Sequence, residues 1–205
     1  LDAPLLGVID VSGPMQAQTP EGSRITLAVD AAKAAVGLFS NTSEVGLWAF
    51  SVDHDPARDW TEIVPVRPIN AAVGETTQAQ LLTKGVESLP GITGGGTGLY
   101  DTALAAFRSA KAGYDPGKVN SVVLLTDGQN DDPRGISLET LLTNLRAEFD
   151  PAQPVMIITI GVGPDVDLDV LQQISAPTGA KAYEARDPAQ IQAVFLDAMT
   201  ARTTR

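Results

Sequence analysis

Two kinds of hydrophobic pattern alternate along the chain. Continuous runs of apolar residues are typical of buried strands, whereas apolar residues that recur every three or four positions indicate helices packed on one side. The continuous runs predict strands over residues 5–10, 45–52, 63–66, 119–126, 155–160 and 180–184. The helical spacing predicts helices over residues 23–39, 75–89, 99–110, 138–149, 168–174 and 191–199. Strands and helices therefore follow one another through the whole chain.

This alternation indicates an α/β fold: a doubly wound, mostly parallel sheet with helices on both faces. Pro65 cannot donate a ladder hydrogen bond, which places the strand predicted over residues 63–66 at an edge of the sheet. Of the 205 residues, 43% are hydrophobic but only 5% are aromatic, so the interior is built mainly from Val, Ile, Leu and Ala. That composition fits a buried parallel sheet, and we expect a single domain over residues 1–205.

The net charge and the cysteine content exclude several classes of function. The net charge of -11 argues against a nucleic-acid partner, because phosphate binding needs clustered Lys and Arg. The lack of cysteine excludes disulfides, thiolate metal ligands and cysteine nucleophiles. No apolar run approaches the roughly 18 residues that cross a bilayer, so we expect no membrane contact by this segment. Since the chain begins at Leu1, without Met or a signal-like leader, we expect a domain excised from a longer, envelope-associated or secreted protein. The cysteine-free, Ala-rich and acidic composition favours a bacterial source, and we expect the domain to be monomeric.

Three short segments, far apart in the sequence, carry acid and hydroxyl groups: residues 10–13 (Asp-Val-Ser-Gly), 94–97 (Gly-Gly-Gly-Thr) and 124–128 (Leu-Leu-Thr-Asp-Gly). Asp10 and Asp127 both come at the carboxyl end of a predicted strand, where ligands gather in open α/β sheets. If those strands are neighbours, the two carboxylates approach each other and require a cation or a proton between them. Oxygen ligands of this kind suit Mg²⁺ better than zinc or copper.

The three segments, in this order and at these separations, resemble the metal ion-dependent adhesion site of von Willebrand factor A domains. That site combines an Asp-x-Ser-x-Ser loop, a Thr after a glycine-rich turn and a later Asp-Gly. The resemblance implies a Rossmann-like sheet of six strands with one antiparallel edge strand. It also implies a site for Mg²⁺, Mn²⁺ or Ca²⁺ in which Asp10 anchors the metal and Ser12 is a direct ligand. Thr97 then binds the ion when a partner is engaged, and Asp127 binds directly or through water.

By the same resemblance, a carboxylate from an Asp or Glu of a partner protein completes the coordination, and the domain is an adhesion module rather than an enzyme. The chain departs from the family pattern at one position. Pro14 stands where the second Ser is expected, and proline supplies neither a hydroxyl nor a backbone N–H. Because Mg²⁺ retains water ligands readily, a water can take the place of that hydroxyl.

Two other functions stay open at this point. One is a scaffolding domain of the same fold in which Pro14 has disabled the metal site. The other is a Mg²⁺-dependent hydrolase with Asp10 as nucleophile, although Ser12 stands where an aspartyl-phosphate enzyme would need a general acid.

Three further sequence patterns do not indicate a binding or catalytic site. The glycine cluster at residues 94–96 lacks the Lys-Ser or Lys-Thr of a phosphate loop, and we expect it only to allow a tight bend. Asp165, Asp167 and Asp169 fail the EF-hand template and are expected to cap a helix. His54, the only histidine, is interpreted as a solvated loop residue.

Overall fold

A six-stranded sheet forms the centre of the protein in a computed structural model that describes residues 4–55, 57–164, 166–186, 190, 193–194 and 196–197. Its strands, in spatial order, are β10 (Ala182–Ala185), β9 (Val155–Val162), β8 (Asn120–Thr126), β1 (Pro4–Asp10), β4 (Glu44–Asp55) and β5 (Arg58–Pro68). All neighbouring pairs are parallel except β4 with β5, which is antiparallel. The predicted mostly parallel sheet with one antiparallel edge strand is confirmed.

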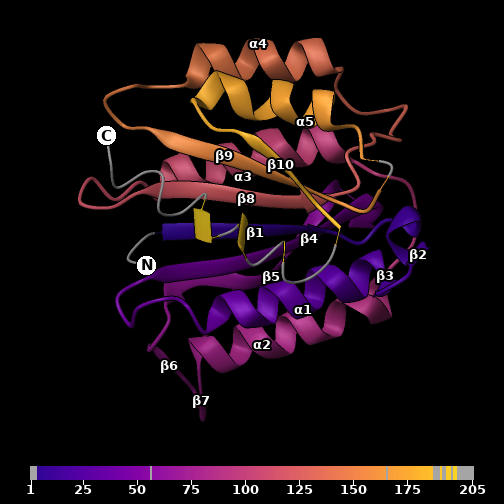
Figure 1. The fold of residues 1–205 in the computed structure, drawn as a ribbon. Helices are drawn as coiled ribbons and strands as arrows, with labels where there is room; N and C mark the ends of the chain where they lie inside the picture. The colour runs from indigo at the N-terminus through magenta and orange to yellow at the C-terminus, as the bar shows by residue number, and fades with distance from the viewer. Residues whose placement is uncertain are drawn as a thin grey trace.

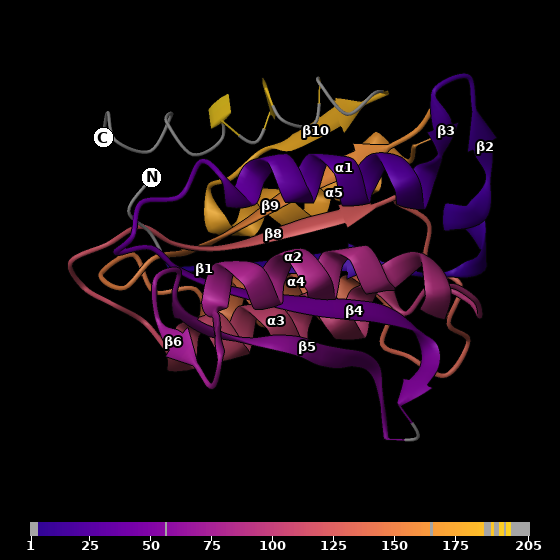
Figure 2. The same cartoon turned by 90° about the horizontal axis from the view of Figure 1, so that it is seen from below.

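Five helices of the described chain lie on the two faces of this sheet (Figures 1 and 2). They are α1 (Arg24–Val36), α2 (Gln78–Ser88), α3 (Leu99–Ala112), α4 (Leu138–Glu148) and α5 (Leu168–Ser175). Short elements join them: η1 (Gly13–Gln16), the hairpin of β2 (Gln18–Thr19) and β3 (Gly22–Ser23), the hairpin of β6 (Ala72–Val73) and β7 (Thr76–Thr77), η2 (Leu89–Ile92) and η3 (Ala176–Thr178). No helix in the described part of the chain combines the length and the apolar character needed to cross a bilayer.

The sheet separates two apolar cores. Successive side chains of β1 point to opposite faces, so Leu5 and Ile9 pack with α1 and α2, whereas Leu6 and Val8 pack with α3, α4 and α5. Because β1, β8 and β9 are covered on both sides, nearly all their residues are buried, which explains the continuous apolar runs in the sequence. The doubly wound arrangement is therefore confirmed.

Several predicted boundaries are wrong. The second helix begins at Gln78 rather than residue 75, because residues 76–77 pair with residues 72–73 and Thr77 then caps the helix through a reciprocal bond with Gln80. The first helix ends at Val36, short of the predicted residue 39. His54 lies in β4 and not in a loop. The strand predicted over residues 63–66 is the edge strand β5, as expected, but it is longer. The helix predicted over residues 191–199 lies mostly outside the described residues.

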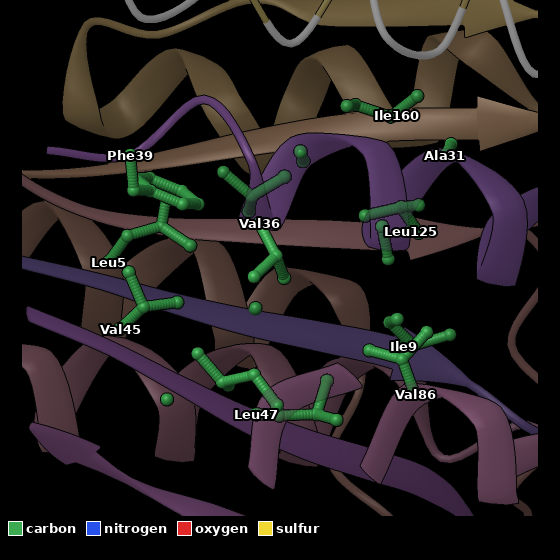
Figure 3. A pocket seen from close by; sticks show the side chains of 16 residues that line it. Leu5, Ile9, Ala31, Val36, Phe39, Val45, Leu47, Val86, Leu125 and Ile160 are labelled. Carbon is green, nitrogen blue, oxygen red and sulfur yellow. The ribbon is translucent and has the colours of Figure 1, made fainter. Parts of the chain in front are cut away.

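A small apolar cavity of about 60 Å³ lies between the sheet and the helices α1 and α2 (Figure 3). Leu5, Ile9, Leu47 and Leu125 line it from the strands, and Val36 lines it from α1. Its origin is visible in the sequence: β1 places a glycine, Gly7, on this face between Leu5 and Ile9. The missing side chain leaves a space that the small alanines of α1 do not fill.

Candidate metal site at the carboxyl edge of the sheet

The two aspartates predicted to form a site lie at the ends of adjacent strands. Strands β1 and β8 pair in parallel, with Ile9 opposite Leu125, so their carboxyl ends meet at one edge of the sheet. Asp10 is the last residue of β1, and Asp127 follows directly after β8. Both side chains are buried, at 0% and 1% relative exposure. The strand order therefore brings two residues that are far apart in the sequence to the same edge.

Backbone hydrogen bonds join the three predicted segments to one another. The N–H of Gly13 donates to the carbonyl of Gly95 at 2.9 Å, and the N–H of Gly94 donates to the carbonyl of Val11 at 2.8 Å. On the other side, the N–H of Asp131 donates to the carbonyl of Thr97 at 2.9 Å. The loop before α3 is thus held between the loop after β1 and the loop after β8.

A glycine is required at the centre of this junction. Gly95 has φ of +75°, and a Cβ there would lie 2.9 Å from the carbonyl oxygen of Val52. Any other residue would be strained and too close to the β4 backbone. The predicted role of the glycine cluster, a tight bend next to neighbouring loops, is confirmed.

Two donors from the protein hold the Asp10 carboxylate. The backbone N–H of Ser12 donates to Oδ1 at 2.8 Å, and the Thr126 hydroxyl donates to Oδ2 at 2.7 Å. Burial raises the pKa of Asp10 from 3.8 to about 6, although interactions with Ser12 and Thr126 oppose the rise; the charge of Asp127 adds to it. The effect of Asp127 on this pKa agrees with the two carboxylates lying close together.

Two buried hydroxyls at the same edge have no hydrogen-bond partner among the described residues. The Oγ of Ser12 and the Oγ1 of Thr97 are buried, yet neither forms a hydrogen bond of regular geometry with the residues that the structure describes. The Ser12 hydroxyl is near enough to Asp10 to lower the pKa of that carboxyl. A buried hydroxyl without a partner is costly, and such groups in native proteins point to strain, to an ordered water or to an ion. These two positions are among the four predicted metal ligands.

Asp127 has a partner that the sequence analysis did not identify. Its Oδ1 accepts a bond from the Gln129 N–H at 3.1 Å, and its Oδ2 lies 3.4 Å from the Nη1 of Arg24. The two charged side chains are only 10% and 2% exposed. Arg24 is the first residue of α1, where the positive end of the helix dipole disfavours a cation. An arginine at the first position of a helix is unfavourable, and this was the one signal in the sequence that Arg24 has a special role.

Pro14, two residues after Ser12, is exposed. It occupies the first turn of η1, a position to which its fixed φ is suited. The N–H of the following residue, Met15, donates to the carbonyl of Ser12 and closes the turn. The backbone of the first loop is therefore well formed, and what it lacks is the hydroxyl that a serine would carry at this position.

A separate group of acids lies among the described residues. Carboxylate oxygens of Asp59, Asp101 and Asp132 lie within 4.8 Å of one another on a partly exposed surface. Asp101 accepts a bond from the Ile136 N–H, and Asp132 accepts one from the Arg134 N–H, so both stabilise the loop that leads to α4. These residues were not predicted as a cluster, because they come from three separate segments.

The aspartates near α5 behave as predicted where they are described. The Asp167 side chain accepts a bond from the Val170 N–H and caps α5, and Asp169 lies in its first turn. Asp165 lies outside the described residues.

Comparisons of the sequence place it among known proteins. A family model described as the von Willebrand factor type A domain matches residues 5–197. Two uncharacterised proteins from strains of Mycobacterium tuberculosis are 26% identical over 157 residues, which is 77% of this chain but 22% of each relative. The chain therefore spans about a fifth of the length of these curated relatives.

Solved structures share the fold at low sequence identity. An aerotolerance-related membrane protein from Bacteroides fragilis has a TM-score of 0.73 at 16% identity, with 97% of this chain and 99% of that chain covered. A von Willebrand factor type A protein from Catenulispora acidiphila has a TM-score of 0.68 at 18% identity, covering 95% and 41%. Proximal thread matrix protein 1 from the mussel byssus, solved with a zinc-occupied metal ion-dependent adhesion motif, has a TM-score of 0.70 at 19% identity, covering 97% and 47%. With the family model matched over nearly its whole length and with this topology, the chain belongs to the von Willebrand factor type A domain family.

Proposed function

We propose that this domain is a protein-interaction module that binds an acidic side chain of a partner through a divalent cation. Asp10, Ser12, Thr97 and Asp127 would hold the cation. When bound, the cation would supply an electrophilic centre for a carboxylate from an Asp or Glu of the partner. No covalent chemistry is required of the domain, so the proposed role is that of a binding module and not an enzyme.

The observation that carries this proposal is the pair of buried hydroxyls on Ser12 and Thr97. Neither has a hydrogen-bond partner in the described part of the chain. Ser12 follows the buried Asp10, and the loop of Thr97 is joined by backbone hydrogen bonds to the loop that contains Ser12. Two neutral hydroxyls and two carboxylates form an all-oxygen ligand set, which suits a hard cation. A dication would satisfy both hydroxyl oxygens and would offset the repulsion between the two carboxylates.

Among hard cations, we propose Mg²⁺ as the resident ion, with Mn²⁺ or Ca²⁺ as substitutes. Because Mg²⁺ keeps several water ligands, a water can replace the serine hydroxyl that Pro14 does not supply. The zinc seen in the mussel protein's adhesion motif makes Zn²⁺ the necessary comparison in any titration. We also propose an envelope-associated or secreted location, supported by the shared fold of the Bacteroides fragilis membrane protein.

The test is a thermal and chemical unfolding comparison in EDTA and in millimolar Mg²⁺. A ligand at 100 times its dissociation constant stabilises the folded chain by about 2.7 kcal/mol, so unmodified protein should show a clear rise in midpoint. Thr97→Val keeps the side-chain volume but removes the hydroxyl ligand. In EDTA this variant should be at least as stable as the wild type, because it removes a buried unpartnered hydroxyl. In Mg²⁺ its response should be much smaller.

Thr102 offers a matched control. Its hydroxyl is also buried and without a partner among the described residues, but it lies within α3 and not in the three loops. Thr102→Val should respond to Mg²⁺ as the wild type does. If the wild type shows no stabilisation by Mg²⁺, Mn²⁺, Ca²⁺ or Zn²⁺, the proposed function is wrong.

One observation favours a second function, that of a scaffold without a metal. Pro14 removes one hydroxyl ligand, and the carboxylate of Asp127 already has a cationic partner in Arg24. Under this alternative Asp10→Ala would leave capture of the natural partner intact, whereas under the metal-dependent proposal that substitution abolishes it.

A further inference from the structure

The cation that already lies at the proposed metal site is the guanidinium of Arg24. Its Nη1 is 3.4 Å from Oδ2 of Asp127, and the pair is almost fully buried. A buried ion pair is weak support for stability, because desolvation of both groups opposes their attraction. Arg24 also occupies the first position of α1, where the helix dipole disfavours a positive charge. Two costs thus fall on one residue.

The surrounding structure makes room for this side chain. Gly163 follows β9 and has φ of +111°, a conformation that side chains rarely adopt. A Cβ at Gly163 would lie 2.6 Å from Nε of Arg24 and 3.1 Å from Cζ. The Arg24 side chain therefore passes over the end of β9 through a space that only glycine leaves open, and reaches Asp127 at the end of β8.

This arrangement changes the charge of the site. Asp10 and Asp127 alone contribute two negative charges, and Arg24 reduces the total to one. A dication held by the same carboxylates would be repelled by the guanidinium, which lowers metal affinity. Once loaded, the site would carry one positive charge where two carboxylates and a dication alone would carry none. That residual charge strengthens attraction for a carboxylate from a partner.

We propose that Arg24 is a built-in cation that weakens metal binding and strengthens binding of the partner's carboxylate at the loaded site. This inference rests on the proposed function of the same site. It assigns to Arg24 a specificity-determining role: in the metal-free protein it neutralises Asp127, and in the loaded protein it adds to the field that an acidic side chain meets.

The experiment compares the wild type with Arg24→Met, which keeps the apolar stem, and with Arg24→Lys, which keeps the charge. Mn²⁺ alone is titrated by calorimetry. Arg24→Met is expected to bind Mn²⁺ at least ~10-fold more tightly than the wild type. Even at the dielectric constant of water, the repulsion between a unit charge and a dication a few ångströms apart is large enough to lower the binding constant about tenfold. Arg24→Lys should remain within about threefold of the wild type, because the charge is retained.

A second readout uses acetate as a carboxylate probe. Its binding to the Mn²⁺-loaded proteins is detected by the change in the electron paramagnetic resonance spectrum of the metal. Acetate is expected to bind Arg24→Met more weakly than the wild type. Unfolding midpoints in EDTA check the fold: Arg24→Met should be less stable than the wild type because Asp127 is then buried without a counter-charge, and Mn²⁺ should restore its stability. If Arg24→Met does not fold in EDTA, Arg24→Gln takes its place, because its amide can still donate to Asp127.

The outcomes separate the two proposals. If the wild type binds Mn²⁺ and Arg24→Met binds it no more tightly, the role of Arg24 is wrong while the proposed function stands. If only Arg24→Met binds Mn²⁺, Arg24 does weaken metal binding, but the proposed function and the carboxylate-binding role that rests on it are both wrong for the natural chain. If neither chain binds any metal, both proposals fail.

Discussion

Replacing Asp10 by asparagine should change stability in a way that depends on pH. Burial raises the pKa of Asp10 from 3.8 to about 6. Each pKa unit corresponds to about 1.36 kcal/mol, so ionising this side chain in the folded, metal-free chain costs roughly 3 kcal/mol relative to the unfolded chain. The amide side chain of the Asp10→Asn variant has nearly the same shape and no charge, and its carbonyl oxygen could still accept the Ser12 N–H. The penalty would therefore be absent from the variant.

The sign follows from proton binding. Between about pH 4 and pH 6 the folded chain keeps a proton that the unfolded chain releases, so the free energy of unfolding of the wild type falls as pH rises through this window. Well below pH 4 both states are protonated, and well above pH 6 the full cost is present. The advantage of Asp10→Asn over the wild type should thus grow by about 2.5 kcal/mol between pH 4 and pH 8.

Urea unfolding of both proteins in EDTA, at intervals from pH 4 to pH 8, measures this difference. Titrating groups that do not interact with Asp10 act on both proteins alike and cancel. Addition of Mg²⁺ at pH 8 should stabilise the wild type but not Asp10→Asn. The stability advantage of the variant should therefore be smaller in Mg²⁺ than in EDTA. A stability difference that stays constant to within about 0.5 kcal/mol across this range would refute the argument that desolvation controls Asp10.

Three further predictions concern metal binding and packing. Since the proton on Asp10 must leave before its carboxylate can bind a metal, Mg²⁺ affinity measured by calorimetry should fall about tenfold per pH unit below pH 6; a flat profile would contradict this. Pro14→Ser should raise Mg²⁺ affinity by about tenfold in the same assay, because it supplies the absent hydroxyl; equal affinities would show that the hydroxyl is not a ligand here. Gly7→Ala should raise the free energy of unfolding by about 0.5 kcal/mol, since its Cβ would make only ordinary contacts at 3.6 Å and beyond next to the cavity. Gly46→Ala is its matched opposite and should destabilise the chain, because its Cβ would lie 2.9 Å from the backbone nitrogen of Val66; similar urea midpoints for the two variants would contradict the packing argument.

Much of the fold could be predicted from periodicity alone. Continuous apolar runs mark strands buried on both faces, and β1, β8 and β9 are such strands. Boundaries were less accurate where a local hydrogen bond decides them, as at Thr77, whose capping bonds delay the start of α2. The hydrophobic pattern indicates which side of a helix or strand is buried, but the position of a helix cap depends on the geometry of two or three side chains.

Residue type and spacing were enough to predict the order of elements, the edge position of β5 and the chemical character of the four candidate ligands at residues 10, 12, 97 and 127. The three-dimensional fold was needed to show that β1 lies beside β8, that the Ser12 and Thr97 hydroxyls are buried without partners among the described residues, and that Arg24 reaches Asp127 over Gly163. Strand pairing, desolvation and charge proximity depend on distances between residues far apart in the chain, and hydrophobic periodicity does not encode those distances.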